Sequence, residues 1–556
     1  MSDYDSEGYI RDLTDRVFLI KQEIEVGKIK ISEDLIEGFI LSFNKIRLRD
    51  DGRVDPSTVD SRIRAMSAAV NHIIERERVK EKYSIIDLQK AYFDILFGNF
   101  GDVYFTMKNC SSDPYSISDF FSKKNDYTQY IYDAFPDFFV QVKEFWESAS
   151  DIGIIHLQDG SQLKANFSGD LFPAYSENAV STAGLYVDTI SLPCPVLRIG
   201  SLHKTADKAE FTRLLLKHVL TCMTYKDVIL EEIEPAIALI LPDRRDFIEH
   251  NYEHLMTQCE PYALSHAQYL YDIKFESYDE FRDFSKGLAD IDTVLDNIKR
   301  PDRIIFDVKW GGDAKQQLVR LLSDKNRISR NVVGDHAGME VFLNILGRMP
   351  QAYSAKINAQ ELGSTPYINA ETSWVYYNWL IEYDSQKYDI GNGKLKSLHM
   401  MHALSDGMKD GFSWLGNVPV DKIIELRRNN LMEEIRDVLS SGVDKLIYSS
   451  PDNYGKTTQQ VIDNIDRAFI EHQRVIVKAK RERLRIYGLD VLPCIASGLI
   501  AITGALTGNA ALGTISAGLG IVGISNIRDI KSKFKERQDR LNTYQASVTG
   551  ILFSHK

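Results

Sequence analysis

Apolar side chains recur every three or four residues over much of the first 150 residues, which is the spacing of one helix face. Two such runs are Ile36, Phe39, Phe43 and Ile46, and Ile63, Met66, Val70 and Ile73. Asp55 followed by Pro56 is typical of a helix start, with the aspartate as cap. Residues 125–148 are rich in Tyr and Phe and predict another buried helix. We therefore expect a helical N-terminal domain over residues 1–150.

The pattern changes near residue 152. The segment IGIIHLQDGSQLKANF places two apolar runs around Asp159-Gly160, which predicts a β-hairpin. Residues 184–192 and 303–310 predict single strands, and residues 234–243 fit a strand or a buried helix. Helices are expected over 243–257, 278–298 and 313–323. Because strands and helices do not alternate regularly, we expect a mixed α+β central domain over residues 151–418.

Helical periodicity returns from about residue 420, and residues 419–556 are expected to form a helical C-terminal domain. The segment 449–453 predicts a loop, after which Thr457 or Thr458 would cap a helix reaching about Tyr487. Along this helix, apolar or His residues follow a spacing of three and four, at Ile462, Ile465, Phe469, His472, Ile476 and Ala479. Such a stripe fits a short coiled coil that self-associates through residues 457–487, or packing against another helix of the same chain.

The least ordinary segment lies between Asp490 and Arg528, where 37 residues contain no Asp, Glu, Lys or Arg. Gly508-Asn509 divides it into halves of 17 and 18 residues. A single membrane-spanning helix needs about 20 apolar residues, so we expect a Gly/Ala-rich helical hairpin over residues 491–527. Small residues would let its two helices approach closely, and the glycines concerned are Gly498, Gly504, Gly508, Gly513, Gly518 and Gly523. The expected fold class is therefore mainly α, with a mixed α+β middle region and this C-terminal hairpin.

Basic segments flank the apolar run on both sides. Residues 474–485 and 528–540 each carry six Lys or Arg, against one and three acids respectively. Since the whole chain has a net charge of −12, this local reversal favours contact with an anionic membrane on its cytoplasmic face. The alternative is a hairpin buried in a soluble helical bundle, and no aromatic residue anchors the run at a membrane interface.

In composition and length, the apolar run resembles the hydrophobic helical hairpin of pore-forming colicins. The resemblance covers residues 491–527 only and implies membrane insertion, without assigning a role to any residue. The leading hypothesis is thus a cytoplasmic effector or regulatory protein whose hairpin binds or enters a membrane. A toxin-like, membrane-damaging role in prokaryotic antiviral defence fits this layout. The alternatives are a soluble metal-dependent hydrolase and a non-catalytic scaffold with the hairpin buried.

Composition narrows the remaining classes. The acidic net charge disfavours broad nucleic-acid binding. The five cysteines are scattered and never form a CxxC pair, which suits reduced thiols better than disulfides or a zinc ribbon. The N-terminal residues MSDYDSEGYIRDL are acidic and lack the apolar core of a secretory signal, so we expect a cytoplasmic protein.

Three short motifs suggest chemistry. His250, Glu253 and His254 match the HxxEH pattern, in which two histidines on one helix face bind zinc and the glutamate acts as a base. Zinc binding would need a third protein ligand, and an exposed helix without a metal would account for the same residues. A second set of residue types, those of a metal-dependent nuclease, occurs in Pro301-Asp302 followed by Asp307-Val308-Lys309. In such nucleases a hairpin separates the two parts of the motif, and here the two parts lie too close together in the sequence for one.

The third motif is Gly455-Lys456-Thr457, which matches the second half of a phosphate-binding loop before a helix. The first glycine of that loop is replaced by Ser450, and a helix cap explains the same residues. His399 and His402 have no partner at a diagnostic spacing. The aromatic block from Trp374 to Tyr383 is expected to pack in a core, since basic residues do not interleave it.

Overall fold

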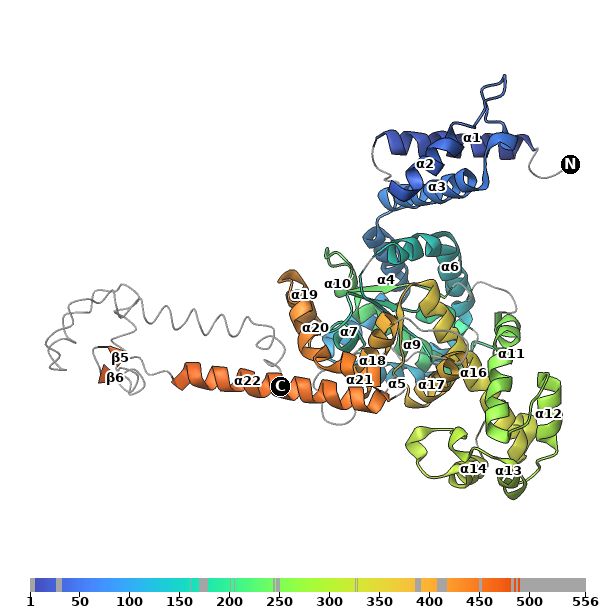
Figure 1. The fold of residues 1–556 in the computed structure, drawn as a ribbon. Helices are drawn as coiled ribbons and strands as arrows, with labels where there is room; N and C mark the ends of the chain where they lie inside the picture. The colour runs from blue at the N-terminus through green and yellow to red at the C-terminus, as the bar shows by residue number, and fades with distance from the viewer. Residues whose placement is uncertain are drawn as a thin grey trace, which may run out of the picture. The chain divides into compact units, whose positions relative to one another are not determined.

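The structure is a computed structural model that describes residues 6–26, 33–160, 162–169, 179–200, 202–204, 206–243, 246, 251–325, 327, 329–385, 392–407, 418–449, 453–481, 485–486 and 489–490. Its described part is mainly helical with a small parallel sheet in the middle of the chain, which confirms the predicted mainly α fold with a mixed middle region (Figure 1). The hairpin expected over residues 491–527 lies outside the described residues.

The chain divides into two compact units, one made of residues 1–91 and 148–159 and the other of residues 92–147 and 160–556. The domain boundaries expected near residues 150 and 418 remain predictions.

The first unit contains helices α1 (Glu7–Glu25), α2 (Glu33–Phe43) and α3 (Ser61–Lys82). Its core includes Leu13, Ile20, Phe39, Val54 and Ile63. Asp55 accepts a hydrogen bond from the Ser57 amide at 3.0 Å, but it caps only the single 3-10 turn Pro56–Thr58. The helix itself starts at Ser61, where Asp60 accepts from the Ile63 amide at 2.9 Å.

The hairpin predicted around Asp159-Gly160 is wrong. Helix α6 (Asn125–Gln158) includes its first half, and the second half contains the parallel strand β1 (Lys164–Phe167). Ile154 and Leu157 are buried three residues apart, so one apolar run fits a helix as well as a strand. Asp159 lies 2.7 Å from Arg76 and 2.9 Å from Lys80. These ion pairs hold the residue at the end of α6 rather than in a hairpin turn.

The second unit is built around four parallel strands in the order β3-β2-β1-β4, with β2 at Thr189–Leu192, β3 at Ala238–Ile240 and β4 at Thr365–Tyr367. Ala165 of β1 is in register with Ile190 on one side and with Thr365 on the other. β1, β2 and β3 are buried at every residue, as in a parallel sheet covered on both faces. Pro366 lies in β4, at the end of the strand order, where a missing N–H group is tolerated.

The parallel arrangement of the strands was not predicted from the sequence, where strands and helices show no regular alternation. Helices connect all four strands, but the strands are only three or four residues long and the last connection spans residues 241–364. After α1, α2 and α3, the described helices before β1 are α4 (Ile85–Asn109), α5 (Pro114–Ser122) and α6. Helix α7 (Ala179–Ala183) lies between β1 and β2, and α8 (Pro195–Gly200), α9 (Lys208–Thr224) and α10 (Lys226–Ile229) lie between β2 and β3. Between β3 and β4 lie α11 (Asn251–Tyr271), α12 (Tyr278–Lys286), α13 (Ile291–Asn297), α14 (Ala314–Ser323), α15 (Arg330–Val333) and α16 (Ala337–Glu361).

The strand predicted over residues 303–310 is also wrong, because that segment contains parts of two 3-10 turns, Pro301–Arg303 and Val308–Trp310. The side chain of Gln317 accepts hydrogen bonds from the Phe306 amide at 3.1 Å and the Asp307 amide at 3.3 Å. Asp307 in turn accepts from the Lys309 amide at 2.9 Å. Side chains thus take the backbone hydrogen bonds that a neighbouring strand would supply.

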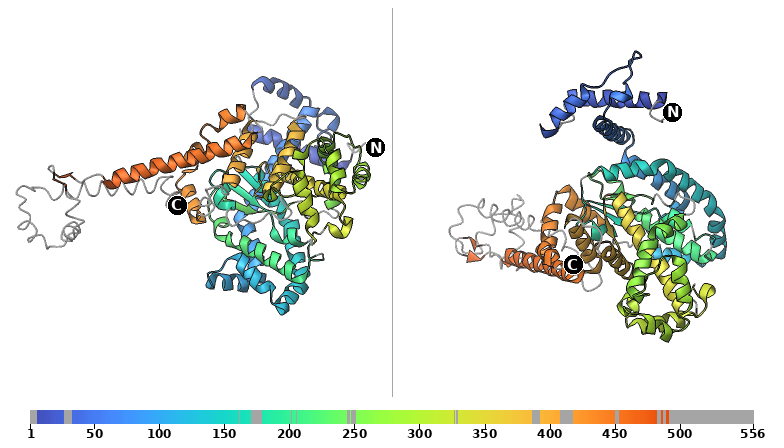
Figure 2. Two further views of the ribbon diagram at one scale, coloured as in Figure 1. Left: turned by 90° about the horizontal axis from the view of Figure 1, so that it is seen from below. Right: turned by 45° about the vertical axis from the view of Figure 1, so that its right-hand side comes forward.

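Among the described residues, six helices follow the sheet: α17 (Glu371–Ser385), α18 (Asn392–Gly407), α19 (Val420–Arg428), α20 (Met432–Ser440), α21 (Val443–Ser449) and α22 (Tyr454–Arg481). The short strands β5 (Arg485–Ile486) and β6 (Leu489–Asp490) then pair in antiparallel fashion. α22 packs against α18, α20 and α21 and continues beyond them as one straight helix (Figures 1 and 2). Asn453, rather than a threonine, starts α22, since its side chain accepts from the Lys456 amide at 3.0 Å.

Two arginines tie this C-terminal group of helices to the sheet. Arg427 of α19 is buried and donates to the carbonyl oxygens of Asp188 and Pro235, which lie just before β2 and β3. Arg436 of α20 donates to the Tyr186 carbonyl at 2.6 Å and forms an ion pair with Asp188. Helices α19 and α20 are therefore anchored at the amino ends of these strands, and α20 in turn packs against α22.

Candidate functional site

The strand order places a change of direction between β1 and β4. The chain proceeds from β1 to β2 and β3 on one side, and then returns to add β4 on the other side of β1. In open parallel sheets, ligands bind outside the carboxyl ends of the strands near such a point. A ligand site is therefore expected among the residues that follow the four strands.

A charged cluster lies beyond the carboxyl ends of β2 and β3. Arg198 of α8 approaches Asp243 with a nitrogen–oxygen distance of 3.1 Å and Asp246 with one of 3.6 Å. Asn358 of α16 donates to the same Asp243 oxygen at 2.7 Å. The side chain of Asp243 is only 5% exposed, whereas that of Arg198 is 21% exposed. The cluster thus holds the partly exposed guanidinium group of Arg198 between two carboxylates. These charged groups are suited to binding a polar molecule.

At the change of direction itself, the β1 and β4 ends touch. The Ser168 amide donates to the Tyr367 carbonyl at 3.1 Å. Gly169 follows with a φ of +89°, and a Cβ atom there would lie 2.7 Å from the side chain of Ile368. Only glycine combines a positive φ with the absence of a Cβ atom, so the close approach of the β1 and β4 ends depends on Gly169. The Ser405 hydroxyl of α18 donates to the Ile368 carbonyl at 3.2 Å, which links α18 to this edge.

Cys194 lies two residues after the end of β2 but is not suited to act as a nucleophile. Its side chain is fully buried, and its Sγ atom lies 3.1 Å from the Tyr92 hydroxyl. Burial raises the pKa of this thiol to about 11. The thiolate is therefore scarce at neutral pH, and the residue packs as a small apolar side chain.

A second polar cluster joins α18 to α22, and we call it the α18–α22 latch: His399, His402, Tyr454, Thr457 and Thr458. A hydrogen bond of 2.9 Å joins His399 Nδ1 to Thr457 Oγ1, and one of 3.3 Å joins His402 Nδ1 to Thr458 Oγ1. The His399 ring stacks on Tyr454 with centroids 4.0 Å apart, and the His402 ring stacks on Trp374 of α17 at 4.4 Å. The structure thus supplies the partners of His399 and His402 that the sequence did not reveal.

The candidate phosphate-loop residues fall within the first turns of α22. Gly455 and Lys456 are exposed, and Thr457 is buried against His399. A phosphate-binding loop of this type follows a strand, whereas residues 445–449 before these three belong to helix α21. Nucleotide binding by these three residues stays a prediction, but Thr457 already has a partner inside the protein.

The candidate zinc residues lie at the start of α11. His250 is outside the described residues, while Glu253 and His254 are exposed in the first turns of the helix. His254 Nε2 lies 3.0 Å from the Gln258 side-chain nitrogen, one turn further along. Within the described part of the chain, no group of three His, Cys, Asp or Glu residues could hold a metal ion. The zinc site therefore stays a prediction.

Asp302 and Asp307, the carboxylates of the nuclease-like pattern, have structural partners. Asp302 pairs with Arg300 at 2.9 Å, and Asp307 caps the turn Val308–Trp310. Hydrogen bonding to Arg300 lowers the pKa of Asp302.

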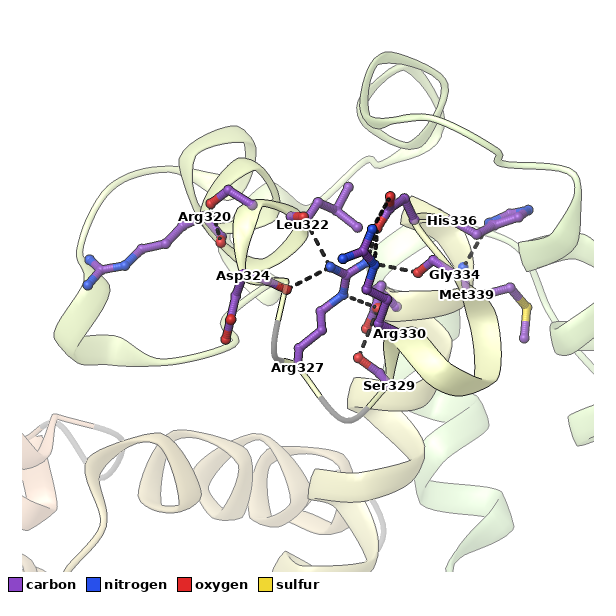
Figure 3. A network of polar contacts seen from close by, with 12 residues as sticks. Arg320, Leu322, Asp324, Arg327, Ser329, Arg330, Gly334, His336 and Met339 are labelled. Atoms are coloured by element: carbon purple, nitrogen blue, oxygen red, sulfur yellow. Dashed lines mark hydrogen bonds and ion pairs between the residues drawn. The ribbon is translucent and has the colours of Figure 1, made fainter.

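A network of polar contacts surrounds Arg327 and is structural (Figure 3). Its Nε atom donates to Glu340 at 2.7 Å, and Nη2 donates to Asp335 at 2.7 Å. The remaining bonds go to backbone carbonyl oxygens of Leu322, Asp324 and Gly334. Both Arg327 and Glu340 side chains are at most 4% exposed. With every guanidinium nitrogen engaged, this arginine fixes the fold of residues 322–340.

Two open hollows lie elsewhere on the described surface. One of about 370 Å³ has a floor that includes Phe100, Phe135 and Phe138, and one of about 470 Å³ is lined by residues that include Glu231, Asp421 and Glu425. Neither is lined by residues of the Arg198–Asp243 cluster or of the α18–α22 latch.

The apolar run 491–527 with its six glycines, and the basic flank 528–540, lie outside the described residues. The flank 474–485 begins on α22, where Arg474 is exposed. Among the helices that the structure describes, none combines the length and the apolar character needed to cross a bilayer. The expected membrane contact through residues 474–485 and 528–540 and the expected self-association through 457–487 stay predictions.

The fold defines a largely helical protein built around a small parallel α/β sheet. Comparison with protein-family models, curated proteins and solved structures found no match. Function therefore has to be argued from the sites themselves.

Proposed function

We propose that this chain is a membrane-acting protein in which an α/β body controls a C-terminal apolar segment. The observation that supports it most is the closeness in sequence of α22 and the charge-free run, which starts ten residues after α22 ends at Arg481. The same helix is held at its other end by buried contacts with α18, α20 and α21. A helix of this kind is suited to transmit the state of the body to the segment that follows it.

The charge pattern supports a membrane as the target. Both basic flanks would face the anionic, cytoplasmic surface if the run enters as a hairpin. In the form we favour, the protein is cytoplasmic until triggered, and entry of the hairpin damages the membrane, as in a toxin-like effector of antiviral defence. The Arg198–Asp243 cluster, beyond the carboxyl ends of β2 and β3, is the place where a polar trigger would bind.

The test is vesicle flotation with the full chain and with a chain ending at Asp490, using anionic and neutral vesicles of matched size. We expect only the full chain to float, and only with anionic vesicles. Release of an encapsulated dye then reports damage to the membrane. Circular dichroism of the shorter chain serves as the folding control.

If neither chain floats, or if both float equally, the proposal is wrong. If the shorter chain fails to fold while the full chain stays off the vesicles, residues 491–556 pack within the protein, which also overturns it.

A further inference from the structure

We propose that α18 is the element through which the carboxyl edge of the sheet controls the hold on α22. This inference rests on the proposed function for its biological meaning, but its test contains no membrane. It concerns one helix, Asn392–Gly407, that contacts both the sheet and α22.

The sheet end of α18 is fixed by Ser405. Its hydroxyl donates to the Ile368 carbonyl at 3.2 Å and lies 3.3 Å from the Asn369 side-chain oxygen. Ile368 and Asn369 are the first two residues after β4, and Ile368 also contacts the Gly169 turn after β1. Any molecule that separates the β1 and β4 ends would therefore disturb the bond at Ser405.

The α22 end of α18 is the latch. His402 precedes Ser405 by three residues and His399 precedes it by six, so all three lie close to one face of the helix. His399 is fully buried and Thr457 is 1% exposed. A shift of α18 would therefore break buried hydrogen bonds rather than exposed ones, and such bonds are the costly ones to leave unmade.

A third contact limits where α22 can move. Asn464 donates to the carbonyl oxygens of Leu439 and Ser441, both at 2.9 Å, at the end of α20. Beyond it the hold weakens, since every side chain from Asp466 to Arg474 is at least partly exposed. The residues that α18 contacts therefore lie in the part of α22 that packs most closely against the rest of the protein. Loss of these contacts would free the start of the helix.

Hydrogen exchange of the full chain, measured by mass spectrometry without vesicles, tests this coupling. Thr458→Val removes the hydroxyl that bonds His402 and should raise exchange of the amides in residues 454–465 about three- to tenfold. Ser405→Ala does not alter any residue that contacts α22 in the latch, yet we expect it to raise exchange in the same segment. Thr458→Ser and Ser405→Thr keep the hydroxyl groups and should restore exchange close to that of the parent chain.

Ser265→Ala is the matched control, because the Ser265 hydroxyl bonds only the Pro261 carbonyl within α11. It should leave exchange in residues 454–465 unchanged. If Ser405→Ala raises exchange around residues 366–370 and in α18 but not in 454–465, the coupling does not exist. The same conclusion holds if the variant that carries both Ser405→Ala and Thr458→Val shows the sum of the two separate effects on exchange, as unrelated sites do. A failed flotation experiment would overturn the proposed function and leave this result untouched.

Discussion

His399 on α18 and Thr457 on α22 are joined by a buried hydrogen bond of 2.9 Å between Nδ1 and Oγ1, across 58 residues of sequence. The His399 ring also stacks on Tyr454, one turn before Thr457 on α22. The start of α22 is therefore fixed by a polar bond and a ring contact together. The first prediction concerns this pair.

Replacing Thr457 by Val keeps the shape of the side chain but removes the hydroxyl. Because this hydrogen bond of His399 lies in a fully buried place, we expect its loss to lower stability by about 1–3 kcal/mol. Urea unfolding of the full chain measures the change. The matched control is Thr106→Val on α4, where the hydroxyl is exposed and bonds only the Asp102 carbonyl one turn away. Equal losses for the two variants would contradict a special role for the latch.

Arg327 should not tolerate replacement by Lys. An ammonium group has three donors in place of the five of a guanidinium, so some of the buried acceptors around Arg327 would be left unbonded. We expect a loss of about 2–4 kcal/mol in the free energy of unfolding. Arg330→Lys, three residues away and more exposed, should change stability by at most about 0.5 kcal/mol. If both changes have the same small effect, the network in Figure 3 does not fix this segment.

His266 should make the protein sensitive to acid. It is fully buried, with Nδ1 2.8 Å from the Tyr383 hydroxyl, and burial together with the nearby Arg303 lowers its pKa from 6.5 to about 3. Between pH 6.5 and 3 the unfolded chain binds a proton that the folded chain does not, so stability falls as the pH falls through this window. At pH 5 the loss from this group is about 2 kcal/mol.

The measurement is urea unfolding at pH 7 and pH 5 for the parent chain and for His266→Gln. The variant starts from a lower stability, but it should lose about 2 kcal/mol less than the parent between the two pH values. Identical losses for the two proteins would show that folding does not lower the pKa of His266.

A charge placed in the apolar run should abolish membrane binding if the proposed function holds. Gly513→Lys or Gly518→Lys puts an ammonium group within the expected hairpin, at a cost of about 2.5–3.5 kcal/mol near the centre of a bilayer. Flotation with anionic vesicles should then be lost while the body stays folded. Gly347→Lys is the matched control, because a Cβ atom at Gly347 of α16 would meet open space. Full flotation by both hairpin variants would rule out insertion.

Sequence periodicity was enough to find many of the helices. The runs through Ile63 and Met66 and through residues 125–148 correspond to α3 and α6, because an apolar stripe at helical spacing needs no knowledge of what it packs against. The same reasoning failed at residues 152–158 and 303–310, where short apolar runs fit more than one backbone and the choice depends on partners such as Gln317.

The sequence by itself determined a mainly helical chain, a mixed middle region and one charge-free run between basic flanks, because these follow from the order and spacing of residue types. Only the tertiary structure decided the parallel sheet order, the Arg198–Asp243 cluster and the latch at His399 and Thr457. The cluster and the latch join residues 45 or more positions apart in the sequence. The sheet order depends on which strands pair. Such contacts are set by how the elements pack in space, and no local pattern of hydrophobic and polar residues encodes them.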